Sequence, residues 1–528
     1  MDELEGHLVS PYDEVLYPSK TLPQTHPSRL ATVAFLRGMQ PASVGRCRVL
    51  ELGCGTAANL IPMAFYHPES EFVGLDSAER PIALGSNAIS DLGLRNITLH
   101  LMDLREANPE KLGHFDYIIA HGVYSWVPQP VRECILAICQ KMLNPQGVAY
   151  VSYNAYPGNH FRDLARGMMR FHVSGFETPA DKIGQARGVL KFLSESKNKP
   201  DYYLNVIRAE FERLLKYSDC GFFHDDLNEI NQPFYFHEFI ANARRHQLQF
   251  VGEAGPNQFN LAELSPSVAA KMNELENGDE IVREQFKDFI QGTAFRQTLL
   301  CHAELELAPR LLSDRVRHLY ARCNAVRLEN RENEGPLKAV FRNASGIEAA
   351  IVHPLVARAL SYICSQYPRS VSFDELLETI HSASGFESGA DDQGNEAAIL
   401  EGALGQLYEQ GFLPLSICPT KVVNRVSERP ATSRLARFQL QSGQLVTNPL
   451  HMSFHFPDPF ARQLLLLLDG SRDREALVRD LVEFSRSTEG RVFENGILVD
   501  GLEQLSSAVE RRLPSGLQSL AREGMLVG

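Results

Sequence analysis

Short apolar runs alternate with amphipathic helical patterns over the first part of the chain. A strand is predicted at each apolar run, and a helix is predicted between each pair of strands. The runs are residues 49–52, 72–75, 97–101, 115–120 and 147–152. This alternation predicts an α/β fold in which a parallel sheet carries helices on both faces.

Two small groups of predicted helices follow the sheet region. Three helices and a short strand are expected in the first group, and the second group repeats that order later in the chain. We interpret them as two copies of a winged-helix-like module, at residues 306–425 and 426–528. Neither segment carries a basic stripe, so contact with protein is favoured over contact with DNA.

Composition and charge exclude several classes of protein. At 528 residues the chain is too long for one compact domain. Its formal net charge of −13 provides no general basic footprint for nucleic acid. No apolar run approaches the ~18 residues of a membrane helix, and the first residues contain no signal core. Nine scattered cysteines without a C-x-x-C pair disfavour zinc and disulfides. We expect a cytoplasmic protein that binds no metal or nucleic acid and does not insert into a membrane.

The first predicted strand, Val49–Leu52, leads directly into the glycine turn Gly53-x-Gly55. Glycines permit positive φ and close backbone approach, and free N–H groups at the start of the next helix attract an anionic group. Asp76 ends the second apolar run, where a doubly wound fold places a carboxylate for ribose hydroxyls. Strand, turn and carboxylate together predict a nucleotide site.

Two cofactors fit this site. Gly53, Gly55 and Ala58 match the dinucleotide fingerprint G-x-G-x-x-G/A. Glu51 favours a different ligand, because an acid just before the turn suits an α-ammonium group better than a pyrophosphate. The run resembles the first motif, E-x-G-x-G, of class I S-adenosylmethionine (SAM) methyltransferases, although Ala57 stands where many relatives have glycine. Under this interpretation the cofactor residues are Glu51, Gly53, Gly55, Asn59, Asp76, Ser77, Asp103, Leu104 and His121.

A methyltransferase sheet of this class ends with a helix and two further strands, one of them antiparallel. Apolar runs at residues 248–252 and 296–303 are candidates for these strands. Residues 160–232 would then be an insertion after the fifth strand, and residues 262–294 a helical insertion before the last. Both would lie over the methyl-transfer face, within a catalytic domain at residues 31–305 preceded by an arm at residues 1–30. Tyr12, Tyr17 and His26 of the arm either close over the ligand or pack on the surface.

Polar and aromatic residues follow the fourth and fifth predicted strands. A lysine acceptor must lose its proton before transfer, because its unperturbed pKa is near 10.4. Apolar and aromatic walls lower that pKa, and aromatic faces also attract the sulfonium. Ordinary hydrophobic packing is the alternative for each residue taken singly. The candidate catalytic residues are Tyr124, Trp126, Asn154 and Tyr156.

Several longer motifs resemble those of bacterial methyltransferases that carry a methyltransferase regulatory domain. They are His121–Pro128, Ser152–Gly158, Thr25–Pro27, His224–Phe236 and Phe295–Leu300. That family includes protein-lysine methyltransferases that modify an outer-membrane autotransporter surface protein. The resemblance implies a class I fold, SAM as cofactor with S-adenosylhomocysteine as product, and a protein lysine as acceptor.

Three functions are compatible with the sequence. The first is N-methylation of lysine side chains in a protein, and the acceptor could be an outer-membrane or surface protein before its export. The second is methylation of a small molecule or natural product on the same fold. The third is SAM binding without catalysis. An open acidic cleft would favour the first and a sealed pocket the second. The sequence does not predict the oligomeric state.

Overall fold

The structure is a computed structural model. It describes residues 15–17, 20–199, 201–255, 265–328, 339–384, 390–487, 490, 493–494, 497–499 and 501–527. None of the helices in this part of the chain has the length and apolar character needed to cross a membrane.

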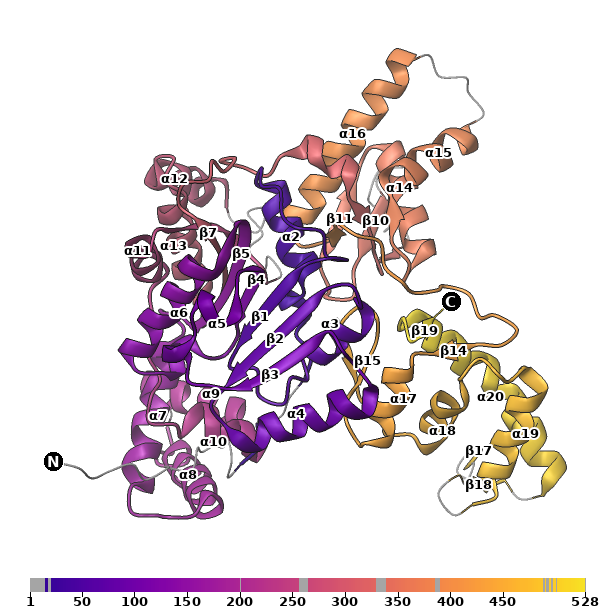
Figure 1. Ribbon diagram of the computed structural model, residues 1–528, viewed down its shortest axis with the longest axis horizontal. Coiled ribbons are helices and arrows are strands. Elements are labelled where there is room, and N and C mark those ends of the chain that lie inside the picture. Colours follow the sequence, from indigo (N-terminus) through magenta and orange to yellow (C-terminus); the bar gives the residue numbers. More distant parts are fainter. Residues whose placement is uncertain are drawn as a thin grey trace.

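A seven-stranded sheet forms the centre of the molecule (Figure 1), in the order β3-β2-β1-β4-β5-β7-β6. Strand β7 is antiparallel to both of its neighbours, β5 and β6, and the other described pairs in this sheet are parallel. The α/β prediction is confirmed, and the two late strands expected near residues 250 and 300 do complete the sheet. The strands are β1 (Arg48–Leu52), β2 (Glu71–Asp76), β3 (Ile97–Leu101), β4 (Phe115–Ala120), β5 (Leu143–Asn154), β6 (Leu248–Glu253) and β7 (Phe295–His302).

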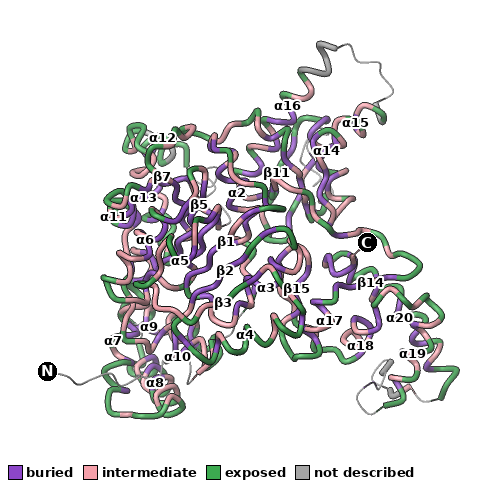
Figure 2. Tube along the Cα trace, in the orientation of Figure 1, coloured by how far each residue is buried: buried purple, intermediate pink, exposed green. Residues whose placement is uncertain are grey.

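Helices cover both faces of the sheet, and the strongest burial follows the strands (Figure 2). Successive side chains of a strand point to opposite faces. Val49 of β1 accordingly packs with α2, α3 and α4, whereas Leu50 packs with α6 and α11. These helices are α2 (Pro27–Leu36), α3 (Leu60–Tyr66), α4 (Glu79–Leu92), α6 (Gln129–Met142) and α11 (Phe236–Arg245), with the short α5 (Pro109–Leu112) before β4.

Two groups of helices interrupt the late part of the sheet topology. Between β5 and α11 the chain forms α7 (Asn159–Val173), α8 (Pro179–Ser194), α9 (Tyr202–Leu214) and α10 (Asp219–Asp226). Between β6 and β7 it forms α12 (Pro266–Glu276) and α13 (Glu280–Gln291). In Figure 1 the first group lies below the sheet and the second beside it.

Two further units with their own hydrophobic cores follow the sheet (Figure 1). The first contains α14 (Pro354–Gln366), α15 (Phe373–Ser384), α16 (Ala390–Glu409), β8 (Tyr320–Ala321), β9 (Val326–Arg327), β10 (Ala339–Arg342), β11 (Glu348–Ile351), β12 (Val371–Ser372) and β13 (Leu415–Ser416). The second contains α17 (Arg434–Gln441), α18 (Pro459–Leu467), α19 (Arg474–Ser485), α20 (Leu502–Arg522), β14 (Ala431–Thr432), β15 (Val446–Thr447), β16 (Ser453–Phe454), β17 (Phe493–Glu494), β18 (Ile497–Leu498) and β19 (Leu526–Val527).

The last helix is longer than the sequence pattern predicts. The pattern places a helix only at residues 517–522, whereas α20 begins at Leu502 and passes through Pro514. Proline usually breaks a helix. Here the apolar side chains on both sides of Pro514, among them Val509, Leu513 and Leu517, are buried in one core. Tertiary packing therefore overrides the local signal.

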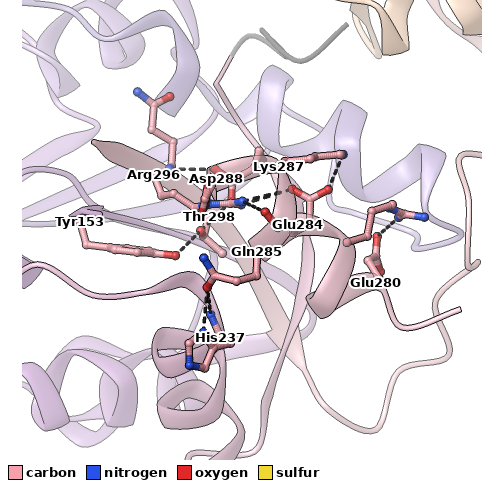
Figure 3. A network of polar contacts seen from close by, with 12 residues as sticks. Tyr153, His237, Glu280, Glu284, Gln285, Lys287, Asp288, Arg296 and Thr298 are labelled. Atoms are coloured by element: carbon pink, nitrogen blue, oxygen red, sulfur yellow. Dashed lines mark hydrogen bonds and ion pairs between the residues drawn. The ribbon is translucent and has the colours of Figure 1, made fainter. Parts of the chain in front are cut away.

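A buried ion network fastens α13 to the sheet (Figure 3). Arg296 of β7 is 4% exposed and contacts Glu253 of β6 at 2.8 Å, Asp288 of α13 at 3.0 Å and Glu284 of α13 at 3.3 Å. Its guanidinium also lies over the ring of Phe236, 4.0 Å from the ring centre. One cation thus neutralises carboxylates from two different elements.

Replacing Arg296 by methionine should destabilise this part of the molecule by about 3–5 kcal/mol, because it leaves buried carboxylates without their cation. Urea-induced unfolding would measure the loss.

The matched control is Lys271→Met in α12. The side chains of Lys271 and its partner Glu274 are 58% and 68% exposed, so this change should cost less than about 0.5 kcal/mol. Equal losses for the two variants would contradict the structural role of the Arg296 network.

Candidate functional site

The turn after β1 has the backbone that a cofactor turn requires. Gly53 and Gly55 have φ of 72° and 53°, and Ala57 has φ of 55°. A Cβ atom on Gly53 would lie 2.5 Å from Val123 Cγ2, so glycine is needed there for space as well as for conformation. The positive φ of Ala57 is a conformation that favours glycine.

Asp76, at the end of β2, holds this turn in place. One carboxylate oxygen accepts a hydrogen bond from Gly55 N at 2.8 Å, and the other accepts from Ala78 N at 2.9 Å. Ser77 follows it and is exposed. The carboxylate therefore lies at the sheet edge where the sequence predicts it.

Glu51 is the buried acid of the site. It is 4% exposed, and its Oε1 accepts a hydrogen bond from Asn59 Nδ2 at 2.8 Å. Among the described residues, its Oε2 has no hydrogen-bond partner. The pKa of Glu51 is raised to about 8, mainly by burial; the Asn59 hydrogen bond acts in the opposite direction, and the Asp76 charge adds to the increase. A buried carboxyl oxygen without a partner fits a cationic ligand group such as an α-ammonium.

The remaining predicted cofactor residues follow the ends of β3 and β4. They are Asp103 and Leu104 after β3, and His121 after β4. Asp103 caps a short turn by accepting from Arg105 N at 2.8 Å, and the Arg105 side chain holds the pKa of Asp103 below its usual value. Leu104 is half-buried beside it. His121 Nδ1 lies 2.9 Å from Tyr150 Oη, and burial lowers the pKa of His121 to about 4. A neutral imidazole therefore stands at the end of β4.

The end of β5 carries a continuous chain of polar contacts. Asn154 Nδ2 donates to Asn231 Oδ1 at 2.6 Å, and Asn231 Nδ2 lies 3.4 Å from Asp163 Oδ1. Tyr156 Oη donates to the other oxygen of Asp163 at 3.0 Å. The ring of Tyr156 stacks on His160 with centres 4.0 Å apart. Asn154 and Tyr156 thus belong to one cluster of polar contacts.

Tyr124 and Trp126 are placed differently. Tyr124 is fully buried on the α6 and α11 face of the sheet, and its hydroxyl accepts from Asn242 Nδ2 at 2.8 Å. Trp126 is half-buried, and the guanidinium groups of Arg162 and Arg166 each lie 5.8 Å from its ring centre. Two arginine side chains of α7 therefore lie over the Trp126 ring.

The arm crosses the site and also contacts the helical insertion. Leu22 N donates to Asn59 Oδ1 at 3.0 Å, beside the cofactor turn. Tyr17 instead reaches Asp225 at 3.4 Å, and its ring lies against His224 near the end of α10. His26 packs between His67 and His451. Tyr12 lies outside the described residues.

Several polar residues of this region are absent from the candidates predicted from the sequence: Thr25, Asp163, Asn231 and His451. Thr25 and Asn231 fall inside motifs on which the family resemblance rests, and that was a usable signal. Asp163 and His451 lie within helical or loop patterns with no local signature. Only the folded chain brings them to the site.

Several of the sequence motifs on which the family resemblance rests lie together at one edge of the sheet. Phe234 pairs with Ala155 next to the end of β5, and Ala155 N donates to Ala294 O just before β7. Ser125 Oγ accepts from Asn154 N, which joins the loop after β4 to β5. Segments far apart in sequence therefore build one site. Within the described part of the chain, no group of three or more His, Cys, Asp or Glu side chains is arranged to hold a metal ion.

A large cavity borders this edge. Its volume is about 1230 Å³, and it lies between β6, β7, α13, the start of α2 and the end of α16. Phe295, which contacts the ring of His121, is part of its wall. The wall carries both acidic and basic side chains, for example Glu253, Glu284, Arg29 and Arg283. The cavity is thus roomy but not predominantly acidic.

Three family models match this chain. Residues 49–147 match a methyltransferase domain, residues 219–302 match a predicted methyltransferase regulatory domain, and residues 428–525 match the PKMT C-terminal winged helix domain. The last match confirms the winged-helix prediction for the C-terminal end of the chain.

One relative matches nearly the whole chain, and another matches about half of it. The uncharacterized protein RP789 of Rickettsia prowazekii is 31% identical over 98% of this chain and 94% of its own length. A second uncharacterized protein of that organism, RP028, is 39% identical over 46% of this chain and 96% of its own length.

The solved structure of PKMT2 from Rickettsia typhi in complex with AdoHcy (S-adenosylhomocysteine) is 28% identical to this chain. It matches with a TM-score of 0.85 over 97% of this chain and 100% of that one. The AdoHcy in that structure, together with the methyltransferase domain, supports SAM as the cofactor. The chain belongs to the class I SAM-dependent methyltransferases that carry a methyltransferase regulatory domain and a PKMT C-terminal winged helix domain.

Proposed function

We propose that this methyltransferase transfers the methyl group of SAM to lysine side chains of a protein. The observation that carries the proposal is the match over nearly the whole chain to a structure named PKMT, the usual abbreviation for a protein-lysine methyltransferase. The narrower form of the proposal is an outer-membrane or surface protein as acceptor, methylated in the cytoplasm before export. Only the family resemblance supports that narrower form.

On the cofactor side, we assign Glu51 to the α-ammonium group of SAM. Its buried oxygen without a partner among the described residues supports the assignment. The glycine turn at Gly53 and Gly55 would face the methionine part, Asp76 and Ser77 the ribose, and Asp103 and Leu104 the adenine. Asn59 would orient Glu51, and His121 would border the methyl group. SAM supplies an electrophilic methyl on its sulfonium.

On the acceptor side, we assign Asn154 and Tyr156 to the lysine amine. The Tyr156 hydroxyl donates to Asp163, so its oxygen can accept a hydrogen bond from a neutral amine. The Asn154 amide nitrogen donates to Asn231, so the Asn154 amide oxygen is the group that can accept a hydrogen bond from the lysine amine. Burial and the Asp163 carboxylate together raise the pKa of Tyr156 to about 12, so the hydroxyl keeps its proton.

Trp126 and Tyr124 would act at the border of this site. The Trp126 ring, with Arg162 and Arg166 beside it, would form part of the wall that excludes water. Tyr124 packs against Tyr153 and Phe234 and would hold the loop after β4 in position. Alignment of the amine and exclusion of water can supply several kcal/mol of the barrier.

We expect SAM affinity to increase with pH up to about 8. The carboxyl of Glu51 must be ionised to pair with an ammonium group, and its pKa in the free protein is about 8. Below that pH the group must first lose a proton, so the Kd for SAM should rise about tenfold for each pH unit. Titration calorimetry from pH 6 to 8, in two buffers of different ionisation enthalpy, would measure affinity and released protons together.

Glu51→Gln should weaken SAM binding and abolish both the pH slope and the proton release. Glu71→Gln, at the opposite end of the sheet in an exposed pair with Arg48, should keep both. An unchanged slope in Glu51→Gln would remove Glu51 from the ammonium site.

We expect Tyr156→Phe to reduce kcat by about 10- to 100-fold, because it removes an oxygen that orients the amine, and to leave the Kd for SAM within twofold. Transfer of a labelled methyl group to proteins of a bacterial lysate, followed by mass spectrometry of the modified residue, would measure the rate and identify the acceptor atom.

The control is Tyr202→Phe, an exposed position on α9 that should not change the rate. Label found on residues other than lysine, or full activity of Tyr156→Phe, would contradict this part of the proposal.

A further inference from the structure

The C-terminal winged helix domain reaches into the cofactor site through one histidine. His451 lies in the turn between β15 and β16 and is 3% exposed. Its Nε2 lies 2.8 Å from Oδ1 of Asn59, the residue that holds Glu51. These two residues are 392 positions apart in the chain. The contact therefore depends on docking of the last domain.

The hydrogen bonds around Asn59 fix the orientation of its amide. The backbone N–H of Leu22 donates to Oδ1 at 3.0 Å, and a backbone N–H can only donate. Oδ1 is therefore the acceptor for His451 as well, whose Nε2 must carry the proton. The NH2 group then points to Glu51 Oε1 at 2.8 Å and to Thr25 Oγ1 at 3.0 Å.

Further contacts hold the domain at this place. Tyr66 of α3 donates through its hydroxyl to Ser433 Oγ at 2.8 Å, and Thr21 Oγ1 lies 2.6 Å from Ser453 Oγ. The arm thus lies between the cofactor turn and the β15–β16 turn. Figure 1 shows this domain beside α3 and α4.

The backbone at His451 indicates that this arrangement is specific. Its φ is 60°, a conformation that residues other than glycine seldom adopt. Burial, with a smaller effect of the His67 charge, lowers the pKa of His451 to about 3, so the ring is a neutral donor at ordinary pH. A neutral imidazole with one N–H suits an amide oxygen as partner.

We propose that His451 is a positioning residue for SAM: it holds Asn59, and Asn59 orients Glu51 toward the cofactor. Binding of the cofactor and docking of the winged helix domain therefore stabilise each other. This inference rests on the assignment of Glu51 to the α-ammonium group. Without the His451 donor, Asn59 Oδ1 would keep, among the described residues, Leu22 N at 3.0 Å and the longer contact with Thr25 Oγ1 at 3.4 Å, and the amide could turn away from Glu51.

Loss of the Asn59 bond would act on the acid itself. That bond lowers the pKa of Glu51, whereas burial and Asp76 raise it. The other titratable groups whose charges couple to Glu51 are Cys54 and Tyr150. His26 and His67 face His451, and burial lowers the pKa of both. A change at position 451 removes the effect of the His451 charge on His26, but the pKa of Glu51 is set by burial, Asn59 and Asp76, so an upward shift of that pKa would report the Asn59 bond.

The test compares His451→Leu with His451→Gln. Leucine keeps the bulk but removes the donor, whereas the glutamine amide can place an N–H near the position of Nε2. His451→Leu should raise the Kd for SAM about tenfold at pH 7.5 and move the midpoint of its pH dependence upward. His451→Gln should restore both toward the values of the unaltered protein.

Two results would overturn the inference. One is a Kd and a pH midpoint for His451→Leu that match the unaltered protein. The other is an equal loss in both variants with no shift of the midpoint, which would indicate domain docking alone. The Glu51→Gln variant distinguishes failure of this inference from failure of the assignment of Glu51 to the α-ammonium group. If Glu51→Gln binds SAM normally, that assignment is wrong, and His451 cannot act on SAM through Asn59 and Glu51.

A measurement on the unaltered protein covers the case in which His451→Leu does not fold. Coupling between two sites is reciprocal. S-adenosylhomocysteine should therefore slow hydrogen exchange at backbone amides of residues 446–454, while those of α19, on the far side of the same domain, should not change. Unchanged exchange at residues 446–454 in the saturated protein would overturn the proposed coupling.

Discussion

Burial of the Glu51 carboxyl group at the end of β1 is the constraint around which the site is arranged. A buried carboxyl is unfavourable unless hydrogen bonds or a counter-charge compensate it. The structure supplies Asn59 to one oxygen and, among the described residues, nothing to the other. A cationic ligand would complete the set. The free protein can instead keep the group protonated, because its pKa is raised to about 8. Cofactor binding and proton loss are thereby linked.

The same constraint explains why distant segments meet here. Asn59 can orient Glu51 only if its own oxygen is occupied, and the donors come from the arm and from the C-terminal domain. At the end of β5, Asp163 of α7 and Asn231 hold Tyr156 and Asn154 by hydrogen bonds in a similar way. At the end of β5 the insertion contacts the strand-end residues directly, whereas at the end of β1 the arm and the last domain contact Asn59, which in turn contacts Glu51. Under the proposed assignments, the first insertion and the last domain would contribute to the site as well as add to the sheet.

The sheet and the cofactor half of the site follow from local sequence signals. The cofactor turn is predictable from Val49–Leu52, Gly53 and Asp76, because the signals for a strand, a glycine turn and a strand-end carboxylate are each local in the sequence. The side-chain partners are not. Trp126 lies beside Arg162 and Arg166, and Tyr124 faces the core, because helices α7 and α11 pack against them. His451 has no local pattern at all, since its partner is in another domain. The proline at position 514 predicts a break, which the surrounding core prevents.

A structure of this protein with bound S-adenosylhomocysteine would test the central claim most directly. The account predicts the α-amino nitrogen within hydrogen-bond distance of Glu51 Oε2, about 2.7–3.0 Å, with Asn59 still bound to both Glu51 and His451. An amino group bound elsewhere, with Glu51 left buried and unpaired, would contradict it.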